Sequence, residues 1–88
     1  MEIRYQQHPD LIAAQMDGET VMLSVTTGKY FALKGIGHFI WEVISQPTSI
    51  DEIVDAVSQR FDVDPAQAQN DCEKFVKDLT ENNLVNKL

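Results

Sequence analysis

Residues 11–25 have the sequence LIAAQMDGETVMLSV, in which two apolar segments flank Asp17-Gly18. An Asp-Gly pair in this setting predicts a β-hairpin that is closed by a two-residue type I′ turn. The turn fixes the register, which pairs Met16 with Glu19, Gln15 with Thr20, Ala14 with Val21, and Ile12 with Leu23. Because side chains alternate between the faces of a strand, this register predicts one apolar face, made by Ile12, Ala14, Val21 and Leu23.

A third strand and a first helix are expected next. Thr26-Thr27-Gly28 has the composition of a turn, and residues 29–33, KYFAL, follow it as the last strand of a meander. Apolar residues then recur at helical spacing from Ile36 to Ile44, and Pro47 ends this helix.

Two further helices have explicit start signals. Ser49 and Glu52 have the spacing of a capping box, and Asp64-Pro65 supplies an N-cap followed by a first-turn proline. Asn82-Asn83 is expected to end the last helix in a left-handed turn, after which Leu84-Val85 returns to the core. The sequence therefore predicts an α+β fold, winged helix-turn-helix-like, with a three-stranded antiparallel sheet followed by three α-helices.

Composition limits the possible functions. The chain has 88 residues, of which 43% are hydrophobic and 24% charged, so we expect residues 1–88 to form a single domain. Seven basic residues against 14 acidic ones give a net charge of −7, which argues against nucleic acid as a partner. There is no signal peptide and no long apolar run, so the sequence predicts a cytoplasmic protein that does not bind a membrane.

The residues that usually carry catalysis are not arranged for it. Cys72 is the only cysteine, and it lies on an apolar helical stripe, where burial should raise its pKa and make it unreactive. His8 is expected to be solvated, and His38 to lie on the surface of a helix. Asp62-x-Asp64 lacks the glycine and the distal glutamate of a calcium loop. We therefore expect no enzyme activity, no catalytic residue, no metal site and no cofactor.

The third strand has one edge that the meander leaves unpaired. Residues 29–33 contain no proline, and their nearest charges are Lys29 and Lys34 at the two ends. Natural edge strands are normally protected by charges, bulges or proline. This edge is therefore either covered by the chain's own helices or available to a partner strand.

Several motifs in order resemble the PqqD-like peptide chaperones, which are also called RiPP recognition elements. They are residues 21–25 (VMLSV), 27–33 (TGKYFAL), Gly37 with 40–44 (IWEVI), 48–53 (TSIDEI), 71–79 (DCEKFVKDL) and 83–85 (NLV). The resemblance spans residues 8–86 and implies a non-catalytic domain that binds the leader segment of a ribosomally made precursor peptide. It implies that the leader adds as a strand beside the third strand and packs on the third helix.

The resemblance also suggests partners and a site. The motifs are most similar to the stand-alone leader-binding proteins of lasso-peptide systems, which present a precursor to a leader peptidase. The alternative is a chaperone that delivers a precursor to a radical-SAM enzyme, and a winged-helix DNA-binding regulator is a more distant one. Phe31, Leu33, Phe75 and Leu79 either line the groove or belong to the core. The candidate peptide-binding residues are Lys29, Tyr30, Phe31, Ala32, Leu33, Asp71, Cys72, Lys74, Phe75, Val76, Asp78 and Leu79.

Overall fold

The expected hairpin and meander are present in the computed structural model, which describes residues 2–88. Strands β2 (Leu11–Met16), β3 (Glu19–Ser24) and β4 (Tyr30–Lys34) form an antiparallel sheet in the order β2-β3-β4. Met16 pairs with Glu19, and the register continues to Leu11 opposite Ser24, as predicted. Asp17 and Gly18 both have positive φ, 51° and 79°, which is the requirement of a type I′ turn.

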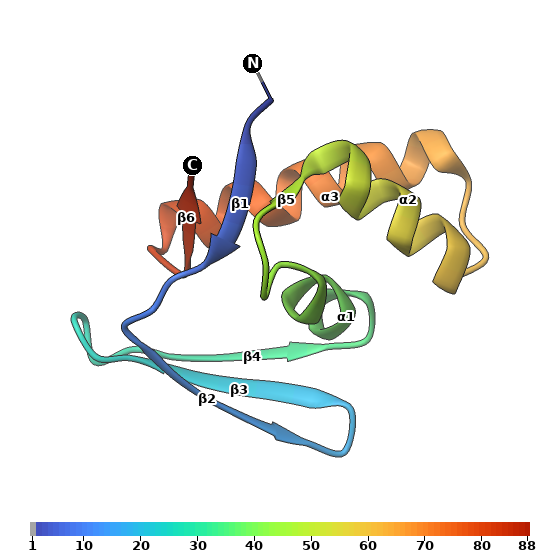
Figure 1. Ribbon diagram of the computed structural model, residues 1–88. Coiled ribbons are helices and arrows are strands. Elements are labelled where there is room, and N and C mark those ends of the chain that lie inside the picture. Colours follow the sequence, from blue (N-terminus) through green and yellow to red (C-terminus); the bar gives the residue numbers. More distant parts are fainter. Residues whose placement is uncertain (1) are drawn as a thin grey trace.

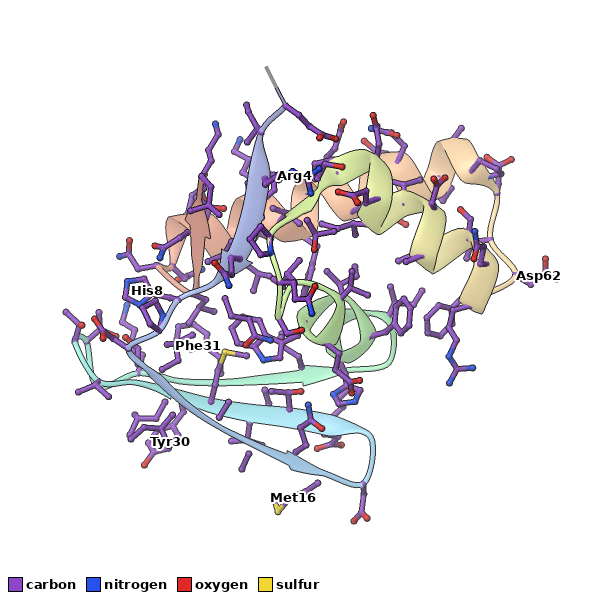
Figure 2. All side chains as sticks on the ribbon, viewed as in Figure 1. Arg4, His8, Met16, Tyr30, Phe31 and Asp62 are labelled. Carbon is purple, nitrogen blue, oxygen red and sulfur yellow. The ribbon has the colours of Figure 1, made fainter. Side chains whose placement is uncertain are left out.

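The apolar face of the hairpin, predicted from its register, is not the face that the fold buries. Thr20, Met22 and Ser24 are 0%, 1% and 3% exposed, whereas Ile12 on the opposite face is 63% exposed. Figure 2 shows the same division, with Met16 and Tyr30 on the side of the sheet away from the helices and Phe31 on the side toward them. The two polar side chains can be buried because each has a hydrogen-bond partner: Thr20 Oγ1 lies 2.7 Å from His38 Nδ1, and Ser24 Oγ accepts from the Thr27 N–H.

The three helices begin where the sequence signals place them. They are α1 (Ile36–Val43), α2 (Ile50–Arg60) and α3 (Pro65–Glu81). Ser49 forms the complete capping box with Glu52, and the Asp64 carboxylate accepts from the Gln67 N–H at the start of α3. Asn83 has a φ of 59°, so the left-handed turn after α3 is also confirmed.

A second sheet joins segments that are far apart in the sequence, and it was not predicted. It contains β5 (Thr48–Ser49), β1 (Arg4–Gln7) and β6 (Val85–Lys87), in the order β5-β1-β6. These strands have two to four residues, and their sequences lack the apolar alternation that marks a strand. Leu84 and Val85 are 1% and 3% exposed, which confirms the expected return to the core.

The core lies between the β2-β3-β4 sheet and the helices. Figure 1 shows α1 between this sheet and the α2–α3 pair, with the second sheet beside the C-terminal part of α3. The largest fully buried side chains come from β3, α1, α2, α3 and the final turn, and include Met22, Ile40, Ile53, Val76 and Leu84. The α+β fold is confirmed, while its winged helix-turn-helix likeness remains a prediction. No helix within residues 2–88 has both the length and the hydrophobicity needed to cross a membrane.

Candidate peptide-binding site

Strand β4 has one free edge, and hydrogen-bond alternation shows which residues face it. The Ser24 N–H donates to the Lys29 carbonyl at 2.9 Å, so the backbone of Lys29 faces β3. In an antiparallel pair every second residue faces the same side, and therefore Phe31 and Leu33 also bond to β3. The backbone N–H and C=O groups of Tyr30 and Ala32 point the other way, to the side where no strand pairs within residues 2–88.

A cavity of about 390 Å³ opens beside the C-terminal half of β4. It is bounded by β4, α1, α2, the loop before α3 and α3 as far as Phe75. Most of the side chains around it are aliphatic or aromatic, and the two charged ones, Lys34 and Asp71, are exposed. The lining residues are Ala32, Leu33, Lys34, Ile36, Gly37, Ile40, Val57, Val63, Ala68, Asp71, Cys72 and Phe75.

Five of the residues expected at the site lie around this cavity. Ala32 and Leu33 come from β4, and Asp71, Cys72 and Phe75 come from α3. The structure thus brings together the strand and the helix that the resemblance implied. Leu33 and Phe75 are half-buried, so each packs against the core and also lines the cavity.

The other seven expected residues do not line the cavity. Val76 and Leu79 are 1% and 4% exposed and belong to the core. Phe31 is half-buried and packs against the core. The remaining four are exposed, on the segment that begins β4 or on the surface of α3: Lys29, Tyr30, Lys74 and Asp78.

Sequence reasoning missed seven lining residues. Ile40, Val57 and Ala68 are core residues, 2%, 1% and 4% exposed, and each also reaches the cavity. Val63 is an isolated apolar residue between two aspartates, and that isolation was a usable signal. The others cluster around the turn from β4 into α1, namely Lys34, Ile36 and Gly37.

Cys72 lies at the cavity wall in an environment that disfavours the thiolate. The residue is 1% exposed, and burial raises the pKa of its thiol above 9.0, the ordinary value. The neighbouring carboxylates of Asp71 and Glu73 raise the pKa further, because they repel a second negative charge. The raised pKa confirms the prediction made from the apolar stripe.

The prediction that His38 lies on the surface was wrong. Its side chain is 16% exposed, with Nδ1 2.7 Å from Thr20 Oγ1 and Nε2 2.6 Å from Glu42 Oε1. The imidazole thus joins α1 to the buried face of β3, and it does not line the cavity. Over residues 2–88, no three His, Cys, Asp or Glu side chains are grouped to hold a metal ion.

The chain is similar to solved structures that contain a leader peptide. A structure described as "TbiB1 in Complex with the TbiA(beta) Leader Peptide" has 30% sequence identity and a TM-score of 0.85, with 91% of this chain and 93% of that chain covered. A second, "Lasso peptide synthetase B1 complexed with the leader peptide", has 22% identity, a TM-score of 0.81 and coverage of 93% and 96%, and it shows the shared fold. No curated protein sequence matches the chain. Residues 19–85 match the family described as "Coenzyme PQQ synthesis protein D (PqqD)", and the chain belongs to this PqqD family.

Proposed function

We propose that this protein is a non-catalytic adaptor that binds the leader segment of a ribosomally synthesised precursor peptide and presents it to a maturation enzyme. The observation that carries the proposal is the 30% identical TbiB1 structure, which was solved with a leader peptide bound and matches this chain over 91% of its length. The 12 residues expected from sequence to bind the peptide remain part of this proposal.

The free edge of β4 supports binding by strand addition. The Tyr30 and Ala32 backbone groups face this edge, so an added strand can pair with both. Alternate side chains of an added strand point to opposite faces of the sheet, and those on the helix side reach the cavity beside Ala32 and Leu33. Backbone pairing would supply alignment, and the cavity would supply selectivity for an apolar side chain.

Two features support a role without catalysis. The thiol of Cys72 is buried and has a raised pKa, so little thiolate is present near neutral pH. His38 contacts the fully buried hydroxyl of Thr20 and the carboxylate of Glu42, and it does not line the cavity, so it is not placed to act as a general base toward a bound peptide.

The partner enzyme has two candidates. The resemblance of the motifs to the stand-alone leader-binding proteins of lasso-peptide systems favours a leader peptidase, and the fold is shared with a lasso peptide synthetase B1 that was solved with the leader peptide. The family description, which refers to coenzyme PQQ synthesis, favours delivery to a radical-SAM enzyme instead. Genes that neighbour this one would separate them: a transglutaminase-like protease and an asparagine-synthetase-like enzyme indicate lasso maturation, and a radical-SAM enzyme indicates the alternative.

The binding mode is tested by placing proline on each free edge of the sheet. Ala32→Pro removes an N–H that faces the free edge of β4. Ala13→Pro is the matched control, because the same alternation places the Ala13 N–H on the free edge of β2. Both positions are exposed, and proline is tolerated on edge strands when its missing N–H faces away from the partner strand.

The probe is a synthetic leader peptide of the precursor encoded beside this chain, and the readout is fluorescence anisotropy. Ala32→Pro should weaken binding about tenfold or more, since it leaves a leader carbonyl unpaired in the interface. Ala13→Pro should leave the affinity unchanged, and circular dichroism should show that both variants are folded. Equal affinities of the two folded variants for the leader would contradict strand addition at β4.

A further inference from the structure

Gly37 lies in a helix, and the backbone conformation at this position does not require a glycine. It is the second residue of α1 and does not have the positive φ of Gly18, Gly28 and Gly35. Alanine at such a position is ordinarily favoured over glycine. The reason for a glycine must therefore lie in what surrounds it.

The aromatic ring of Phe75 lies closer to Gly37 than a side chain at position 37 would ordinarily allow. A Cβ built on Gly37 would lie 3.1 Å from Phe75 Cζ and 3.2 Å from Phe75 Cε1. The next nearest atom, Leu33 Cβ, would be 3.9 Å away, which is an ordinary contact. The ring is therefore the neighbour that would have to move, by a few tenths of an ångström, and the atoms concerned are the far end of a side chain that can rotate.

This contact is part of the cavity wall. Gly37, Leu33 and Phe75 all line the cavity, and they come from three different elements. A methyl group at position 37 would displace the Phe75 ring. Phe75 packs against the core and also lines the cavity, and a ring moves more easily into open space than into a close-packed core. The position of the ring, and with it the usable volume, therefore depends on the absence of a side chain at position 37.

We propose that Gly37 is a specificity-determining residue: by letting the Phe75 ring lie against α1, it keeps the cavity open to one bulky apolar side chain of a bound peptide. The identity of the occupant rests on the proposed peptide-binding function. Its chemical class follows from the wall, which is apolar apart from the exposed Lys34 and Asp71. A charged side chain placed there would lose its hydration without a buried partner.

The cavity itself is tested with toluene, an apolar probe that does not depend on any peptide. Binding is followed through the methyl NMR signals of Ala32, Leu33, Val57 and Ala68, which line the cavity. The wild-type protein should bind toluene, and Gly37→Ala should bind it roughly tenfold or more weakly, as expected when an apolar pocket loses the room for part of its guest. The Tm of Gly37→Ala should be unchanged or raised, because alanine favours the helix.

Phe75→Leu is the matched control variant, because it removes the ring atoms that the methyl group of Gly37→Ala would contact. Gly37→Ala should have no effect on toluene binding when it is combined with Phe75→Leu, so the two changes should be strongly non-additive. If Gly37→Ala alone does not fold, the comparison of Phe75→Leu with the double variant still tests the inference. An equal loss in both backgrounds would overturn it, as would wild-type protein that does not bind toluene.

Alanine replacements in the leader peptide then test whether one of its side chains occupies the cavity. In the wild-type protein, one bulky apolar leader residue should lose affinity when it is replaced by alanine, and in Gly37→Ala the same replacement should matter much less. If toluene discriminates between the two proteins but neither binds the leader, the proposed function fails and the role of Gly37 in the cavity stands. If the leader binds but both proteins respond equally to every alanine replacement, the specificity role of Gly37 is overturned.

Discussion

The Cys72 thiol shows how neighbouring residues determine the chemistry of a single side chain. Burial and the carboxylates of Asp71 and Glu73 both favour the neutral thiol, so the pKa is raised. The folded state therefore holds this proton more tightly than the unfolded chain. The resulting contribution to stability is full below the ordinary thiol pKa of 9.0 and is lost as the pH rises through the higher pKa of the folded state.

We expect folded Cys72 to react slowly with a thiol reagent at pH 8, because the thiolate is the reacting species and it is scarce in this environment. The measurement compares the rate of reaction with Ellman's reagent in native buffer and in denaturant. Cys72→Ala should keep most of the leader affinity. Equal rates in the native and denatured protein would contradict the burial of this thiol.

Thr20 and His38 form a second buried contact, and the sequence offered no signal for it. Thr20→Val should destabilise the protein by about 1–3 kcal/mol, because a ring nitrogen of His38 loses its partner in a mostly buried position. Thr26→Val is the control: Thr26 is exposed, and the change there should stay within about 0.5 kcal/mol. Urea unfolding measures both. A similar loss for the two variants would show that the Thr20–His38 contact contributes nothing specific.

At the scale of elements, helix ends are defined by short-range signals, and α2 is the clearest case. Ser49 Oγ accepts from the Glu52 N–H at 3.2 Å, and the Glu52 carboxylate accepts from the Ser49 N–H at 3.0 Å. The hydrogen bonds from Ser49 lower the pKa of Glu52, and Arg4 lowers it further. The resulting contribution of Glu52 to the stability of the folded state is present above the ordinary pKa of 4.5. It is lost as the pH falls through the lower pKa that Glu52 has in the folded protein.

Ser49→Ala should lower the free energy of unfolding by about 1 kcal/mol at pH 7, the usual effect of removing an N-cap side chain. The difference from the wild-type protein should shrink as the pH falls from 4.5 through the lower pKa that Glu52 has in the folded protein. Ser45→Ala, at an exposed position near the end of α1, should have little effect. Denaturant titrations at pH 7 and pH 3 measure these changes, and a difference that does not depend on pH would contradict the role of the Glu52 carboxylate.

The elements that could be predicted from the sequence are those whose ends are defined by short-range signals. Asp17-Gly18, Ser49 with Glu52, and Asp64-Pro65 act within four residues of themselves, so the turn and both helix starts could be predicted. The buried face of the hairpin could not, since burial of Thr20 depends on its contact with His38, which lies 18 residues away on α1. For the site, β4 and α3 were identified, whereas Gly37 and Val57 belong to it only because the helices pack around a shared cavity.

Two properties belong to the molecule as a whole: the pairing of strands that are far apart in the sequence, and the net charge. Strand β1 near the N-terminus pairs with β6 near the C-terminus and with β5 between α1 and α2. No local pattern encodes those contacts, which is why this sheet was not predicted. The net charge of −7 acts over the whole surface as well, and α3 exposes Asp71, Glu73, Asp78 and Glu81 against Lys74 and Lys77.

We expect no binding to duplex DNA at physiological salt, because an acidic surface repels phosphates and gives no release of counterions. A gel-shift titration at several salt concentrations checks this. Salt-sensitive binding would favour the winged-helix regulator over the peptide adaptor.

The central claim, that the leader pairs with the free edge of β4, is tested most directly by hydrogen exchange of single backbone amides with and without the leader peptide. The account predicts that the leader slows exchange at Tyr30 and Ala32, whose N–H groups face the free edge. Phe31 and Leu33 should be protected in both states by β3, and Ala13 on the opposite edge should not change. Protection that appears in α2 while Tyr30 and Ala32 exchange as in the free protein would contradict the account.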